Sequence, residues 1–214
     1  MDTVLDNLDL FAEGLLVTVQ LALISFAGAF LIGIVVAGFR VSPVPPLRAV
    51  GMFYVETVRN TPLVLIMFLF FFGLTKVAIQ YSGFTTGVIC LSLYTGAYVA
   101  ETIRSGINSV AQGQAEAARA VGLTFLQVLG IVVLPQALRT VVQPIGNLFA
   151  ANTKNTAIVY AIGVVDLTGT ADRLGNQAAD TIATLFAAGI GYLLLLIPAG
   201  FLFGVIERRV AIKR

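Results

Sequence analysis

The stretch SVAQGQAEAARAVGLTFLQVLGIVVLP, residues 109–135, decides the fold prediction because it is the longest central passage that does not resemble a membrane span. Long apolar runs dominate the chain on both sides of it, whereas its first half mixes polar side chains with alanine. We expect two short helices folded over each other at a membrane surface, a shape suited to docking into another protein. An amphipathic hairpin lying on lipid headgroups, or an ordinary loop, are the alternatives.

Helix start and stop signals divide this stretch. Ser109 with Gln112 forms a capping-box pattern and Gly122 is a typical C-terminal stop, so we expect a short exposed helix over residues 110–121. Thr124 with its following glutamine repeats the start signal for a second helix that runs toward Pro135.

The composition of the whole chain indicates a membrane protein that crosses the bilayer several times. It is 58% hydrophobic and 11% charged, with a mean hydropathy of +0.95. A soluble core cannot use that much apolar surface. The 214 residues have room for about five spans of roughly 20 residues, and we expect an all-α fold with residues 1–214 forming a single domain.

The residue types exclude several kinds of chemistry. The chain has no histidine and one cysteine, Cys90, which removes disulfide frameworks, thiolate metal sites and imidazole acid–base catalysis. No Gly-Lys dipeptide occurs, so the chain has no phosphate-binding P-loop, and any ATP must be hydrolysed by another chain. The first thirteen residues are acidic without a basic residue, so we expect the first span to be retained rather than cleaved.

Apolar runs predict five spans, over residues 14–39, 49–75, 84–103, 134–160 and 181–206. A stripe of small residues in the first, at Ala29, Gly33 and Ala37, predicts close helix packing. Only fourteen residues, about 21 Å of helix, separate Arg139 from Lys154, so at least one of these charges must lie at membrane depth or at an interface. Pro144 and Gly146 suggest a bend between them.

The distribution of charge supports this count. Five spans place the central stretch and the C-terminus on one side and the acidic N-terminus on the other. Most basic residues then share the first side, namely Arg40, Arg48, Arg59, Arg104, Arg119, Arg139, Arg208, Arg209, Lys213 and Arg214. The positive-inside rule makes that side cytoplasmic, so we expect the N-terminus outside and the C-terminus inside.

The order of residues in the central stretch resembles the EAA motif of permease subunits of ATP-binding-cassette (ABC) importers. Glu116-Ala117-Ala118, Gly122, Ile131 and Leu134-Pro135 agree with it at the expected spacing. The resemblance implies a type I importer permease fold in which residues 109–127 form cytoplasmic coupling helices that sit in a cleft of an ATPase subunit. The predicted coupling residues are Gln112, Glu116, Ala117, Ala118 and Gly122.

Three further segments, ETVRNTP, AYVAETIRSGI and NTKNTAIVYAIGVVDL, look like the histidine, glutamate and glutamine uptake branch of these permeases, and the likeness covers residues 11–212. It implies a non-catalytic membrane subunit in the plasma (inner) membrane. Its implied partners are a second permease, identical or homologous, two ATPase subunits that bind ATP and Mg²⁺, an extracellular solute-binding protein and membrane lipid. We expect no cofactor or metal in this chain and no nucleic-acid partner.

Lys154 lies in a band of five polar residues, 152–156, inside otherwise apolar helix. Either its side chain reaches the outer headgroups and the band holds helices together, or it contacts substrate. The predicted substrate-binding residues are Lys154, Asn155, Thr156, Glu101 and Thr61. Many members of the branch have Lys-Asp-Thr-Ser where this chain has Lys154-Asn155-Thr156-Ala157. A path for a second carboxylate should lack fixed negative charge, so we expect glutamate as substrate, with glutamine or aspartate next.

Two acid–arginine pairs stand one helical turn apart, Glu56 with Arg59 and Glu101 with Arg104, and we expect each to pair on its own helix. Tyr94 and Tyr98 share a helix face and are expected to pack rather than to contact a cation. A secondary transporter or channel working alone would need a set of intramembrane acids for ion coupling, and only the two glutamates are candidates. A membrane scaffold that transports nothing would have no use for the polar band.

Overall fold

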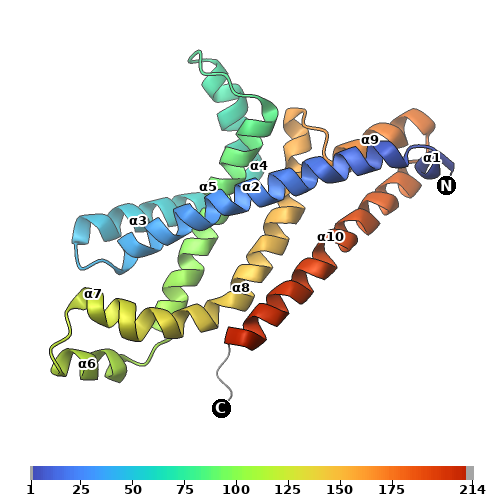
Figure 1. Cartoon of the computed structure of the whole chain (residues 1–214). Coiled ribbons are helices and arrows are strands. Elements are labelled where there is room, and N and C mark those ends of the chain that lie inside the picture. The colour runs from blue at the N-terminus through green and yellow to red at the C-terminus, as the bar shows by residue number, and fades with distance from the viewer. Residues whose placement is uncertain (1, 211–214) are drawn as a thin grey trace.

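The computed structural model describes residues 2–210, and within that range the chain is helical and contains no strand (Figure 1). Lys213 and Arg214 of the predicted basic tail lie outside the described residues. The elements are α1 (Asp2–Leu5), α2 (Leu8–Val41), α3 (Pro45–Arg59), α4 (Leu63–Phe68), η1 (Leu69–Gly73), α5 (Gly83–Asn108), α6 (Gln112–Ala120), α7 (Phe125–Gln127), η2 (Val128–Val133), α8 (Leu134–Asn155), η3 (Thr156–Ile162), α9 (Leu167–Ala178) and α10 (Thr181–Val210).

Four helical segments are long and apolar enough to cross a membrane, at Leu8–Val41, Gly83–Asn108, Phe125–Ile162 and Thr181–Arg209. The predicted second span over residues 49–75 is instead a pair of helices, α3 and α4–η1, bent by 102°. The prediction did not include this break, which Pro62 causes, and the pair still counts as a fifth span if the two helices cross the membrane together. Proline lacks the backbone N–H and disfavours helical geometry in the residue before it, so α3 ends at Arg59 and α4 begins after Pro62.

The small-residue stripe forms a close helix contact. Ala29, Gly33 and Ala37 are all buried where α2 packs along α5. A Cβ added at Gly33 would lie 2.3 Å from Cγ1 of Val99, so only glycine allows this approach. The predicted role of the stripe is confirmed, and it fixes α2 against the middle of α5.

The central stretch forms two helices joined by a tight turn, as predicted. Gly122 has φ +89°, the left-handed geometry of a helix stop. The capping box that starts α7 is present, with the Thr124 N–H donating to Gln127 Oε1 at 2.9 Å and the Gln127 N–H donating to Thr124 Oγ1 at 3.4 Å. The predicted cap at Ser109 was wrong, because α5 extends to Asn108 and the Ser109 hydroxyl donates to the carbonyl oxygen of Gly106 at 2.7 Å.

The second helix of this stretch and the fourth span are one continuous helical segment of 38 residues, Phe125–Ile162. It passes through a π-helical part, η2, and ends in the 3₁₀ helix η3, for a length of roughly 60 Å. Pro144 and Gly146 both lie inside α8. Gly146 allows α10 to come close, since a Cβ there would lie 2.7 Å from Cγ of Phe203.

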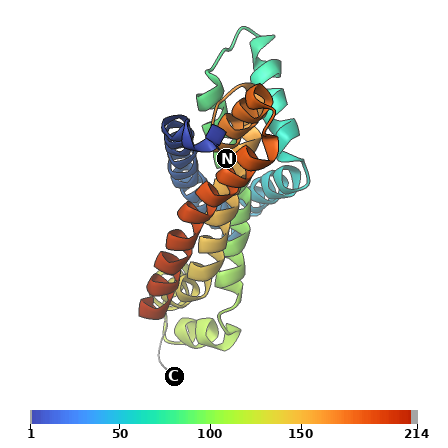
Figure 2. The same cartoon turned by 90° about the vertical axis from the view of Figure 1, so that its right-hand side faces the viewer.

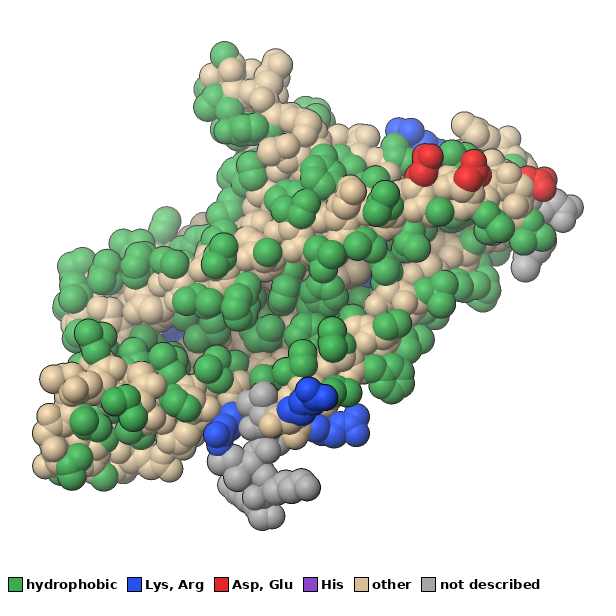
Figure 3. Space-filling model, in the orientation of Figure 1, with side chains coloured by type: hydrophobic (Ala, Val, Ile, Leu, Met, Phe, Trp, Pro, Cys, Tyr) green, Lys and Arg blue, Asp and Glu red, His purple; other side chains and the backbone are tan. Residues whose placement is uncertain are grey.

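The two ends of the bundle differ in what they carry. The N-terminus and α9 lie together at one end, whereas α6, α7 and the C-terminal end of α10 lie at the other (Figures 1 and 2). Acidic side chains gather beside the N-terminus and basic ones near the C-terminus, with hydrophobic side chains covering much of the face between them (Figure 3). Helix α1 and the C-terminal end of α10 therefore lie at opposite ends of the bundle.

Candidate functional site

A buried network of neutral hydrogen bonds joins three helices near the middle of the bundle. Asn152 on α8 has no exposed surface, and its Oδ1 accepts from Thr95 Oγ1 on α5 at 2.8 Å. Its Nδ2 donates to Ser25 Oγ at 2.9 Å and to the carbonyl oxygen of Ala22 at 3.2 Å, both on α2. Because every polar atom of this amide is paired, Asn152 acts as a structural connection between helices.

This network fixes the depth of the polar band. Thr95 lies midway along α5, and Asn152 pairs with it, so Lys154 also lies near mid-span. Lys154 is exposed on the face of α8 turned away from Asn152, where Gln143 and Asn147 are also exposed at helical spacing. A polar stripe therefore runs along one exposed face of α8, and inside a membrane such a stripe would need water or a partner.

The other predicted substrate residues of the band differ in access. Asn155 is half-buried at the end of α8, and Thr156 has no exposed surface. The Thr156 hydroxyl donates to the carbonyl oxygen of Thr153 at 2.8 Å. In this conformation the exposed groups of the band are Lys154 and part of Asn155, while Thr156 and Asn152 hold the helix.

Glu101 forms the centre of an ion cluster between α2, α3 and α5. Its carboxylate pairs with Arg40 of α2 and Arg104 of its own helix, and Arg59 of α3 lies 3.7 Å from it. The predicted Glu101–Arg104 pair is present, but the Arg40 contact was not foreseen. Three arginines around one carboxylate give the cluster a net charge of +2.

The predicted Glu56–Arg59 pair is replaced by other contacts. Arg59 turns toward Glu101, while Asn60 donates from Nδ2 to the Glu56 carbonyl oxygen at 2.7 Å and to its Oε2 at 3.4 Å. The expectation for Tyr98 was also wrong, because the Arg59 guanidinium lies over its ring at 5.2 Å from the centroid, a cation–π arrangement. The Tyr98 and Tyr94 hydroxyls lie 3.2 Å apart.

Thr61 occupies the break between α3 and α4, and its hydroxyl donates to the carbonyl oxygen of Thr57 at 2.8 Å. Helix α4 packs on η3 in a hydrophobic cluster that includes Met67 and Val159. The break therefore directly precedes a helix that contacts η3, the segment into which the polar band runs. Glu101 stands six residues beyond Thr95 on α5, about 9 Å further along the axis. The predicted substrate residues therefore divide into a mid-span layer and a charged layer nearer the end of α5.

The predicted coupling residues lie on α6 and the turn after it. Gln112, Glu116, Ala117 and Gly122 are exposed, whereas Ala118 is 8% exposed and packs against Val128 and Val133 of η2. Ala118 therefore anchors α6 to the continuous helix and has little surface to offer another protein. Gln136 Nε2 adds a hydrogen bond to Gln114 Oε1 at 2.5 Å between the same elements.

Asp166, which directly precedes α9, is a second structural centre. It caps α9 by accepting from the Gly169 N–H at 2.9 Å, and it accepts from the Tyr192 hydroxyl of α10 at 3.0 Å. Thr18 of α2 accepts from the Leu167 N–H at 3.0 Å. Burial raises the pKa of the Asp166 carboxyl, against the lowering effect of these donors. Its signal in the sequence was an aspartate directly before a helix.

The sequence and fold were compared with known proteins. Residues 29–212 match the family model described as the inner membrane component of binding-protein-dependent transport systems. A probable glutamine ABC transporter permease protein, GlnM of Bacillus subtilis, is 37% identical over 95% of this chain and 94% of its own length. The glutamate transport system permease protein GluC of Corynebacterium efficiens is 36% identical over 92% of each chain.

The same architecture occurs in a solved structure, described as a crystal structure of an amino acid ABC transporter with histidines. The match has a TM-score of 0.90 at 33% identity and covers 96% of both chains.

Proposed function

Because this chain belongs to the family of inner membrane components of binding-protein-dependent transport systems, we propose that it is the membrane-spanning subunit of an ATP-driven importer of an amino acid, with glutamate as substrate. In this proposal it works with a second permease subunit and an extracellular solute-binding protein. Separate ATPase subunits bind ATP and Mg²⁺ and hydrolyse the ATP. The N-terminus faces outside and the C-terminus and α6 face the cytoplasm.

The observation that carries the substrate proposal is the exposed Lys154 at mid-span beside a neutral amide. An exposed ammonium at this depth is costly in lipid and favourable beside an anion. Asn155 adds no negative charge, and the acid of the next layer, Glu101, is surrounded by three arginines. The polar face is thus suited to a substrate with an extra carboxylate and unsuited to a cationic one. Glutamine is the second candidate, supported by the similarity to GlnM.

The continuous helix Phe125–Ile162 supplies the route from the ATPase to the polar band. Force applied to α6 passes through Ala118, Val128 and Val133, which pack together, and through the Gln136–Gln114 hydrogen bond. From there it travels along an unbroken helix to Lys154 and Asn155. Closure of the ATPases is proposed to move this helix and open the path outward, and hydrolysis lets it return, which is alternating access.

The test is uptake by the complete transporter, with its ATPases and binding protein, in proteoliposomes. Labelled glutamate should enter only with ATP, and unlabelled aspartate or glutamine should compete better than lysine. Lys154→Gln should reduce glutamate uptake strongly, since the only exposed mid-span cation of the described polar stripe is lost, while Asn155→Asp should weaken glutamate uptake more than glutamine uptake. Uptake of lysine or arginine without any glutamate uptake would refute the substrate proposal and leave the family membership intact.

A further inference from the structure

A cavity of 340 Å³ lies between the N-terminal part of α2 and α9, at the end of the bundle that carries the N-terminus (Figure 1). Its volume is enough for a small molecule. Four polar side chains line it, Glu13, Thr170, Arg173 and Gln177, and its other lining residues are apolar or glycine. Figure 3 shows a basic side chain next to acidic ones at this end of the molecule.

Two opposite charges line this cavity without pairing. Glu13 on α2 and Arg173 on α9 are both exposed. Within the part of the chain that the structure describes, neither forms an ion pair with the other or with a third residue. Asp172, which precedes Arg173 in the chain, accepts instead from the Tyr160 hydroxyl at 2.8 Å. A small molecule that carries both an ammonium and a carboxylate could therefore satisfy both charges at once.

The helices that carry these charges are held in fixed contact beside the cavity. A Cβ added at Gly14, the residue after Glu13, would lie 2.4 Å from Oγ1 of Thr170, so α2 and α9 touch closely there. The Leu167 N–H at the start of α9 donates to Thr18 Oγ1 of α2 at 3.0 Å. The two charges thus stand on packed helices rather than on a loop, which is the arrangement that positions a binding site precisely.

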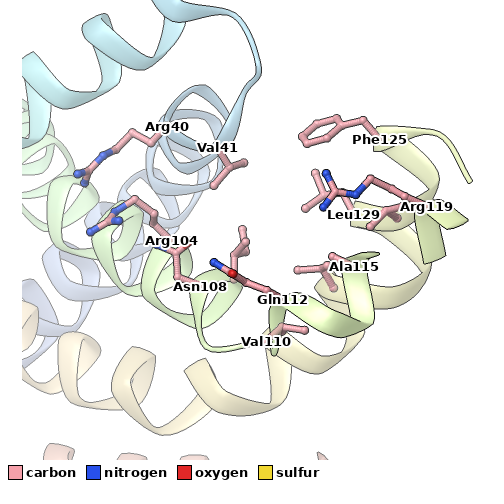
Figure 4. A pocket seen from close by; sticks show the side chains of 13 residues that line it. Arg40, Val41, Arg104, Asn108, Val110, Gln112, Ala115, Arg119, Phe125 and Leu129 are labelled. Carbon is pink, nitrogen blue, oxygen red and sulfur yellow. The ribbon is translucent and has the colours of Figure 1, made fainter. Parts of the chain in front are cut away.

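The larger cavity beside α6, of 730 Å³, lacks this combination of charges (Figure 4). Its lining residues include no acidic side chain, and Arg119 reaches into it from α6. The guanidinium groups of Arg40 and Arg104 point away from it in Figure 4 and pair with Glu101. An isolated cation can attract an anion, but it offers nothing to an ammonium group, so the two cavities differ in the ligand charge that they suit.

We propose that the cavity between α2 and α9 binds a free α-amino acid, with its α-carboxylate at Arg173 and its α-ammonium at Glu13. The side chain of the amino acid lies against the apolar lining, beside the Gln177 amide. Both recognised charges belong to the part that all α-amino acids share, so the site does not depend on which one is transported. The choice of an amino acid rests on the proposed function, in which this end of the bundle faces outside and the cavity receives the substrate before the polar stripe of α8.

The chain lacks tryptophan, so Leu10→Trp places a single fluorescent reporter in the cavity wall. The full-length protein in phosphatidylcholine nanodiscs is titrated with L-glutamine, with its α-amide, which lacks the carboxylate, and with glutaramic acid, which lacks the ammonium. L-Glutamine should change the emission saturably, and each analogue should bind about fivefold more weakly or worse. Gln177→Trp, on α9, is the second reporter. Phe201→Trp, at a 68% exposed position of α10 outside the cavity, should not respond.

Charge variants in the Leu10→Trp background test the two residues. Glu13→Gln and Arg173→Gln should each weaken L-glutamine binding about fivefold, the effect of losing one exposed ion pair. One matched control is Asp9→Asn, which removes an exposed acid one helical turn before Glu13 and outside the cavity. The other is Arg119→Gln, which removes the arginine that reaches into the larger cavity. Both controls should leave the affinity unchanged, and thermal unfolding verifies that each variant is folded.

Three outcomes would overturn the proposal. Equal binding of L-glutamine and either analogue would show that the cavity does not recognise both charges. The absence of a saturable response with both reporters would show that no amino acid binds there. A change in emission on adding phosphatidylethanolamine to the nanodiscs, which L-glutamine does not reverse, would assign the cavity to a lipid headgroup. Uptake by the complete transporter is a separate measurement: binding here without ATP-driven uptake would refute the proposed function alone, and uptake without binding here would refute this site alone.

Discussion

The two polar clusters on α5 are built differently, and the difference separates a fixed part of the molecule from an adjustable one. At mid-span, Thr95 and Asn152 belong to a fully buried network of neutral groups in which each partner is paired. Near the end of α5, Glu101 is 23% exposed among arginines that are 10%, 32% and 37% exposed. A buried neutral network is costly to rearrange, whereas water can replace contacts in the charged cluster. Helix movement should therefore be concentrated at the α6 end.

The strongest test of the fixed part is Asn152→Leu. It removes three hydrogen bonds and leaves the Thr95 and Ser25 hydroxyls without this partner, so we expect the unfolding free energy in detergent to fall by about 2–3 kcal/mol. Thermal unfolding measures this. Asn147→Leu, an exposed asparagine on the same helix, should change stability by less than about 0.5 kcal/mol. Equal losses in the two variants would mean that the network does not hold the helices.

Two glycines of α2 test the same difference between a tightly packed region and a loosely packed one. Gly33→Ala should destabilise by about 2 kcal/mol, because its Cβ would meet Val99 in the close contact with α5. A Cβ at Gly38, one turn later, has nothing within 4 Å, so Gly38→Ala should be neutral or stabilise by up to about 1 kcal/mol through helix propensity. Chemical denaturation of both variants measures the difference. A destabilised Gly38→Ala would show that the C-terminal end of α2 is packed as tightly as its middle.

Asp166 tests whether the end of the bundle that carries α9 belongs to the fixed part. Asp166→Ala removes the cap of α9 and the acceptor for Tyr192, and should cost about 1–2 kcal/mol. Because burial raises the pKa of this carboxyl, the folded protein holds the proton more tightly than the unfolded chain.

The contribution of Asp166 to the free energy of unfolding therefore declines as pH rises from the ordinary aspartate range through its raised pKa. Denaturation at several pH values in the parent and in Asp166→Asn measures this slope. The asparagine variant should lack it, and an identical slope in both proteins would assign the pH dependence to other groups.

The smallest expected change in stability is at the charged cluster. Glu101→Gln should cost less than about 1 kcal/mol, because the arginines are partly exposed and can turn to water. Its effect should instead appear in the coupling of ATP hydrolysis to transport, measured as ATPase rate with and without substrate. A stability loss matching that of Asn152→Leu would contradict the distinction between the two clusters.

Local signals in the sequence predicted local structure well. Gly122 and the Thr124–Gln127 box act within a few residues, and the structure contains both. The Ser109 prediction failed because the same polar pattern can close one helix or open the next. Pro62 indicated the helix break after Arg59, although the apolar residues that follow it still predicted a membrane span.

Features set by contacts between distant segments could not be predicted in this way. Arg40 reaches Glu101 across 61 residues because α2 and α5 pack together, so no spacing rule on one helix indicates it. The depth of Lys154 depends on the register between α8 and α5, which the Asn152–Thr95 bond fixes. The resemblance indicated the family and the polar band, but only the structure separates the exposed lysine from the buried threonine beside it.

The continuous helix has a mechanical consequence. Its hydrogen bonds at Asn152 hold it to α2 and α5 at one point, with roughly 40 Å of helix on the side of Phe125 and roughly 20 Å on the side of Ile162. The longer side includes η2, which packs on α6, and Figure 1 shows the segment changing direction between α7 and α8. A displacement of α6 can therefore be taken up by bending along the longer side before it reaches Asn152.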